Sequence, residues 1–222
     1  MPEVPWWSVV SSAAAPILLA GGWTVAAELQ PGHYDPIRQS VSTLAAIGAS
    51  DRWVMTLAFV LTAVCYIATG VGLRLAASAG RLILVTAGLA GMMVAASPEP
   101  ASGGFSLAHA AWSTVGFALM AAWPLFASQR GAAVPWALRP TIAVGVAVII
   151  VVSLAWFIAE LKNGGVQLGL AERVVGEVQA LWPLVVVLSC RMSAKRTGHA
   201  PLHSPERMRV HRSGTRADHW NP

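Results

Sequence analysis

Six long apolar stretches constrain this chain more than any other feature of its sequence. Most of them reach the roughly 20 residues that an α-helix needs to cross a bilayer. Only 11% of the 222 residues are charged, against about 25% in ordinary soluble domains. A soluble fold of this size cannot hide so much apolar surface, so the sequence indicates an integral membrane protein.

We expect an all-α fold, because backbone groups in lipid must pair within their own segment. The predicted architecture is a bundle of six transmembrane helices with a short interfacial amphipathic helix in the first outer loop. The six predicted spans are Ser8–Leu29, Arg52–Leu75, Arg81–Ala96, Phe105–Ser128, Leu138–Ala159 and Val174–Cys190. Residues 1–191 would form this domain, and residues 192–222 a basic, disordered cytoplasmic tail.

The distribution of lysine and arginine predicts how the chain is threaded. With six spans, both termini share one side of the membrane. That side carries eleven of the Lys and Arg residues and the other side carries four. Cytoplasmic loops are enriched in these residues, so we expect both termini in the cytoplasm. The composition suits a bacterial protein, and the predicted location is the inner (cytoplasmic) membrane.

Most of the net charge of +5 comes from the tail that begins after Arg191. Basic residues next to a membrane attract anionic lipid headgroups. We therefore expect the bilayer and its headgroups as partners, and no nucleic acid. The sequence names no protein partner.

A polar stretch, "HYDPIRQSVSTLAAIGASDRW", lies between the first two spans. Asp35 is a good helix cap, and Pro36 suits the first helical position. Apolar residues then recur at helical spacing, and Gly48 can end the helix. This pattern predicts a short amphipathic helix lying on the outer membrane surface.

Two segments carry a resemblance to a known family. They are "YDPIRQSVSTLAA" (Tyr34–Ala46) and "SPEPASGGFSLAH" (Ser97–His109), the second leading into the fourth span. Together with the six-span layout, they resemble the bacterial membrane family called domain of unknown function nine-nine-eight, over roughly Ser8–Arg191. The resemblance implies a six-helix integral membrane protein and supplies no activity.

Ionisable residues outside the tail gather at the predicted outer side. Seven of the ten acidic residues and both histidines outside the tail fall there. Such groups at membrane depth are costly and usually face a cavity or a partner. The candidate catalytic residues are His109, Glu177 and Asp35. The candidate metal ligands are His33, Glu99 and His109. The candidate substrate-binding residues are His33, Tyr34, Arg38, Glu28, Glu160 and Arg173.

Three functions are compatible with these residues. The first is a structural, lipid-facing or accessory envelope protein with a polar outward-facing vestibule, in which the outer acids pair with nearby cations such as Arg38 and Arg173. The second is a metal-dependent or acid–base membrane enzyme acting on a lipid-linked substrate, although no HExxH, CxxC or nucleophile-elbow motif is present. The third is a small-molecule transporter. A divalent metal fits the second function, and we expect neither haem nor nucleotide.

Overall fold

Six long apolar helices form the described part of the molecule, as the sequence predicts. The computed structural model describes residues 4–32, 34–101 and 104–198. The helices are α1 (Trp6–Glu28), α2 (Trp53–Gly72), α3 (Ser78–Ala96), α4 (Leu107–Ala127), α5 (Pro140–Asn163) and α6 (Leu168–Gly198). All six are long and apolar enough to cross a membrane, which confirms the predicted class of a multi-pass helical membrane protein.

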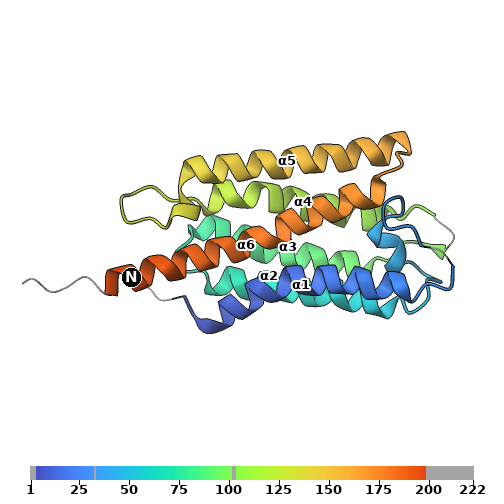
Figure 1. Ribbon diagram of the computed structural model, residues 1–222, viewed down its shortest axis with the longest axis horizontal. Helices are drawn as coiled ribbons and strands as arrows, with labels where there is room; N and C mark the ends of the chain where they lie inside the picture. The colour runs from blue at the N-terminus through green and yellow to red at the C-terminus, as the bar shows by residue number, and fades with distance from the viewer. Residues whose placement is uncertain (1–3, 33, 102–103, 199–222) are drawn as a thin grey trace, which may run out of the picture.

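The helices form a ring in chain order. Each packs against the next one, and α6 closes the ring by packing against α1 as well as α5 (Figure 1). The α1–α2, α3–α4 and α5–α6 connections lie together at one end of the bundle, which we call the predicted outer end. The start of α1 and the end of α6 lie at the opposite end.

Helix α5 lies at the edge of the bundle (Figure 1). It packs against α4 and α6, and only 17% of its most apolar segment is buried within the protein. Its exposed large hydrophobic side chains are valine, isoleucine and leucine, for example Val148 and Val152. A helix with this composition on its exposed side must face hydrocarbon, so lipid contact follows from the fold.

The predicted interfacial helix differs from the structure in type, start and position. Residues 36–38 form a turn, and the helix that follows is a short 3₁₀ helix, η1 (Val41–Ala45), capped by the Ser40 side chain. Most of η1 is buried: Val41, Leu44 and Ala45 are each less than 5% exposed. The segment therefore packs into the predicted outer end of the bundle, against α1, α2 and α6, instead of lying on the membrane surface.

Candidate functional site

A histidine near the start of α4 joins two distant segments. His109 is 6% exposed. Its Nδ1 atom lies 3.0 Å from the carbonyl oxygen of Ser97, at the end of α3, and its Nε2 atom lies 2.9 Å from Oγ of Ser42 in η1. A carbonyl oxygen can only accept, so Nδ1 carries a hydrogen and donates it to Ser97. In the neutral ring, Nε2 is then the acceptor, and it faces the Ser42 hydroxyl.

Glu172, near the start of α6, holds the same 3₁₀ helix from the other side. Its Oε2 atom accepts a hydrogen bond from the backbone N–H of Val41 at 2.8 Å. Its Oε1 atom lies 3.4 Å from Oγ of Ser42. The single hydroxyl proton of Ser42 therefore has two acceptors within reach, and Nε2 of His109 is the nearer one. Three elements, α4, α6 and η1, meet at this serine, and the end of α3 joins them through His109.

Ser42 and Glu172 line a cavity inside the bundle. Its volume is about 140 Å³, and residues of η1 and of every helix except α5 contribute to its wall. Most of the wall is apolar or aromatic, including Leu19, Phe59 and Met120. This cavity lies between helices that are long and apolar enough to span the membrane.

One polar group in the cavity wall lacks a partner. The side chain of Thr62 in α2 is 6% exposed, and its Oγ1 atom makes no hydrogen bond within the described part of the chain. A buried hydroxyl without a partner costs free energy. A polar atom of a bound molecule can supply the missing contact.

Tyr34 and Arg173 form a second cluster, at the predicted outer end. Nη2 of Arg173 donates to the Tyr34 hydroxyl at 2.9 Å, and that hydroxyl lies 3.0 Å from each of the carbonyl oxygens of Gln39 and Ser40. The guanidinium also lies 5.6 Å from the centres of the Tyr34 and Trp23 rings. Burial raises the pKa of Tyr34 above its ordinary value, although Arg173 acts in the opposite direction.

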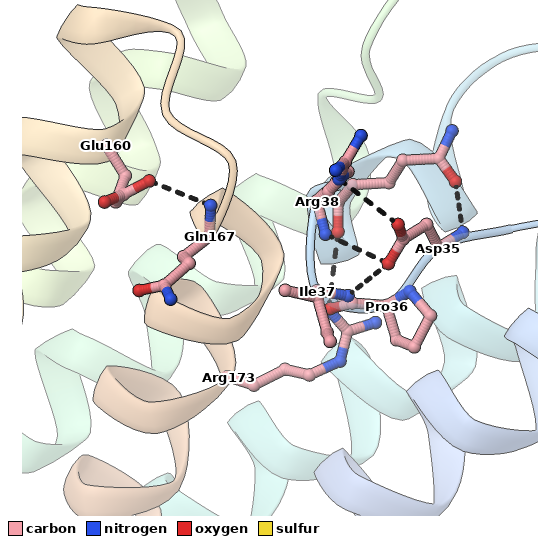
Figure 2. Close-up of polar contacts among 8 residues, drawn as sticks. Asp35, Pro36, Ile37, Arg38, Glu160, Gln167 and Arg173 are labelled. Atoms are coloured by element: carbon pink, nitrogen blue, oxygen red, sulfur yellow. Dashed lines mark hydrogen bonds and ion pairs between the residues drawn. The ribbon is translucent and has the colours of Figure 1, made fainter.

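Arg173 also binds backbone, not a carboxylate. Its Nη1 atom donates to the carbonyl oxygen of Pro36 at 2.7 Å (Figure 2). The same atom donates to the carbonyl oxygen of Gly169 at 3.0 Å. The predicted pairing of the outer acids with nearby cations is thus largely wrong. Within the described residues, the ion pair shorter than 4.0 Å is the exposed one between Arg38 and Asp35, at 3.6 Å. The carbonyl groups of an irregular loop need donors, and the guanidinium supplies them.

Asp35 has a structural role in this turn. Its Oδ1 atom accepts from the backbone N–H groups of Ile37 at 2.9 Å and Arg38 at 3.3 Å, as Figure 2 shows. Asp35 therefore caps a turn and not the predicted α-helix. In the described residues, the Asp35 carboxylate contacts Ile37 and Arg38 and makes no hydrogen bond with His109 or Glu177, so these three candidate catalytic groups do not converge.

Glu28, Glu160 and Glu177 make no side-chain hydrogen bond with His109 in the described part of the chain. Glu28 is exposed at the end of α1. Glu160 accepts from the backbone N–H of Gln167 at 2.9 Å and stabilises the α5–α6 turn (Figure 2). Glu177 has a buried Oε1 atom without a hydrogen-bond partner in the described chain. His33 lies outside the described residues. Among the residues that the structure describes, no three His, Cys, Asp or Glu side chains are grouped to hold a metal ion.

Glu99 lies beside a second, more polar hollow at the predicted outer end. Its volume is about 390 Å³, and its wall comes from the α1–α2 loop and residues 99–101. The backbone joins these two loops, since Ile47 N–H donates to the Glu99 carbonyl at 2.9 Å. The α1–α2 loop and residues 99–101 thus meet at this hollow, whereas Glu160, Glu172 and Glu177 do not line it.

The sequence analysis did not identify Ser42, Glu172 or Thr62 as site residues. Ser42 falls within the segment predicted as a surface helix, and a serine carries no signature without a partner. Its partners are 67 and 130 residues away in the chain. The available signal was the presence of a polar residue in each of the two segments that resemble the family, Ser42 in one and His109 in the other.

Comparison with known proteins identifies the family. A family model described as "Protein of unknown function (DUF998)" matches residues 12–189. The chain belongs to the DUF998 family. The match includes all the residues of the Ser42–His109–Glu172 cluster and of the cavity, and it ends before the tail. No curated protein and no solved structure matches this DUF998 chain.

Proposed function

We propose that this DUF998 protein is a lipid-facing protein of the bacterial inner membrane that binds the apolar part of a lipid in its intramembrane cavity. The observation that carries the proposal is the cavity of about 140 Å³ lined mainly by apolar side chains. An apolar cavity of about 150 Å³ stays dry and accepts a molecule the size of benzene. A short segment of an acyl chain has a comparable size.

The polar part of the wall favours an amphiphile over a pure hydrocarbon. Ser42, Glu172 and the unpartnered Thr62 hydroxyl line the same cavity as the apolar side chains. Binding sites for small molecules combine an apolar wall with a few polar groups that fix orientation. A lipid ester or a lipid alcohol has both parts, and it is present at high concentration around a membrane protein.

The proposed orientation places the cluster near the outer leaflet. The side of the membrane that holds the termini carries eleven Lys and Arg residues, and the other side carries four. This difference supports cytoplasmic termini. The α1–α2 loop and the hollow beside Glu99 then face outward. The basic tail, of which residues 199–222 lie outside the described residues, is next to the inner leaflet, where anionic headgroups attract it.

A photoreactive fatty acid tests the proposal directly. The protein in native-like membranes is incubated with a fatty acid that carries a diazirine in its chain, and the labelled peptides are mapped by mass spectrometry. We expect labels on cavity residues of α1, α2 or α4. Labels restricted to exposed side chains such as Val148 would contradict the proposal.

Two glycine variants sharpen this experiment. A side chain at Gly176 begins 3.6 Å from Leu19 and 3.9 Å from Trp23, two residues of the cavity wall, so Gly176→Leu fills part of the cavity. A side chain at Gly21 meets no atom within 4 Å, so Gly21→Leu is the matched control. Gly176→Leu should lose cavity labelling, and Gly21→Leu should keep it. Equal labelling in both would contradict the proposal, provided both elute as folded monodisperse protein.

A further inference from the structure

We propose that Ser42 is a nucleophile activated by His109, and that the protein cleaves an ester of an apolar chain held in the cavity. This inference rests on the proposed lipid binding and goes beyond it by naming a reaction. An activated serine needs a base within hydrogen-bond reach and a third group that orients the base. All three are present around His109.

The geometry of the pair meets these conditions. Nε2 of His109 and Oγ of Ser42 are 2.9 Å apart, within the range expected of a nucleophile and its base. The Ser97 carbonyl, 3.0 Å from Nδ1, holds the ring in the tautomer whose Nε2 accepts a proton. The backbone of α4 is fixed too, since His109 N–H donates to the Ser106 side chain at 3.2 Å.

The environment of the pair selects an apolar substrate. Ser42 lines the cavity, whereas the ring of His109 lies behind it and is buried. A chain lying in the cavity therefore brings its ester group towards Ser42. The free hydroxyl of Thr62 offers a hydrogen bond to a polar atom of the same ligand. Glu172, which binds Val41 and approaches Ser42, acts as a positioning residue.

The reaction has two balanced steps. In the first, Oγ of Ser42 attacks the ester carbonyl carbon, and its proton moves to Nε2 of His109. The C–O bond of the ester then breaks, the departing alcohol takes that proton, and the acyl group remains on Ser42. In the second, water attacks the acyl group, His109 accepts a proton from the water and returns one to Ser42, and a free carboxylic acid leaves.

A long-chain alkyl fluorophosphonate is the probe for the first step. It phosphonylates an activated serine, with fluoride as the leaving group. We expect one label per chain, on the peptide that contains Ser42. Ser42→Ala should abolish the label, and His109→Gln should slow labelling by about 100-fold or more, the usual scale for loss of a general base. Ser153→Ala, in α5 and outside the cavity, is the control and should label like the parent protein.

Hydrolysis of umbelliferyl esters tests the complete reaction. Dodecanoate should be cleaved faster than acetate, because only the longer chain fills the apolar cavity. Ser42→Ala and His109→Gln should lose this activity. If Ser42→Ala does not fold, Ser42→Cys replaces it. His109 should then accelerate alkylation of that thiol relative to the Ser42→Cys, His109→Gln double variant.

The outcomes separate this inference from the lipid-binding proposal. Absence of a fluorophosphonate label on folded protein, or a label that persists in Ser42→Ala, overturns the nucleophile. If the diazirine fatty acid still labels the cavity in that case, lipid binding stands without catalysis. If Ser42 reacts with the fluorophosphonate while the fatty acid does not label the cavity, the substrate is not a lipid ester and the inference as stated is wrong.

Discussion

The carboxylate of Glu172 accepts a hydrogen bond from the backbone N–H of Val41, 131 residues earlier in the chain, at 2.8 Å. This contact ties the first residue of η1 to α6. Glu172→Ala removes the acceptor and leaves a part-buried N–H unpaired, which should cost about 1–3 kcal/mol. SDS titration in mixed micelles measures the free energy of unfolding.

Glu160→Ala is the comparison for this variant. The Glu160 carboxylate also accepts a hydrogen bond from a backbone N–H group, that of Gln167, at 2.9 Å. This bond lies in an exposed turn. Water replaces the lost acceptor there, so the cost should be smaller than for Glu172→Ala. Equal losses of stability in the two variants would show that the Glu172 contact is no more important than a surface bond.

Arg173→Lys should destabilise the predicted outer end. One guanidinium contacts the carbonyl of Pro36, the carbonyl of Gly169 and the hydroxyl of Tyr34. An ammonium group cannot reproduce this planar arrangement of donors. We expect a loss of about 1.5–3 kcal/mol, the usual range for hydrogen bonds to a charged group, measured by the same titration. Arg38→Lys, whose parent side chain is 68% exposed and ion-paired at 3.6 Å, should change stability by less than about 0.5 kcal/mol.

The stability of the protein should decrease at alkaline pH through Tyr34. Its pKa in the folded protein is raised above 10.0, mainly by burial. The folded state therefore favours the protonated phenol. Its contribution to stability is complete below pH 10 and falls as the pH rises from there through the folded-state pKa. Tyr34→Phe should be less stable than the parent near neutral pH, and the difference should shrink above about pH 10. A constant difference at all pH values would contradict this assignment.

Gly80→Ala should disrupt the contact between α3 and α4. A Cβ atom at Gly80 would overlap the backbone of Ala127. Backbone atoms, unlike the end of a flexible side chain, cannot move aside to make room. We expect a cost of at least about 2 kcal/mol, in the range for overpacking. Gly145→Ala is the control: its Cβ would meet nothing within 4 Å, and alanine suits a helix better than glycine by about 0.5–1 kcal/mol. Thermal unfolding in detergent should therefore separate the two variants.

The six spans were predictable because hydrocarbon imposes one requirement on every spanning segment. The structure confirms each span, with shifts at the ends, the largest at α6, which continues to Gly198. The short helix was mispredicted because contacts with α6, which is distant in the sequence, replace the local backbone hydrogen bonds of an α-helix. The carbonyls of Pro36 and Gln39, which an α-helix would use internally, accept from Arg173, and that of Ile37 accepts from Leu170 N–H.

The candidate site was only partly predictable for the same reason. His109 was found from its type and its depth in the membrane, since a buried histidine in a span needs polar partners. Its partners are a backbone carbonyl and a serine, and neither has a sequence signal. Glu177 was chosen on the same grounds as His109, yet it does not line the cavity. Membrane depth identifies polar residues that need a partner, but not which partner they have.

The position of Glu172 and Arg173 near the start of α6 has a consequence for biosynthesis. The α1–α2 loop is made early, yet the donors and acceptor that satisfy its backbone belong to the last of the six spans. Until α6 has been inserted, Val41 N–H and the Pro36 carbonyl have no intramolecular partner from that helix. A chain stalled after α5 can therefore span the membrane five times and still lack an assembled site.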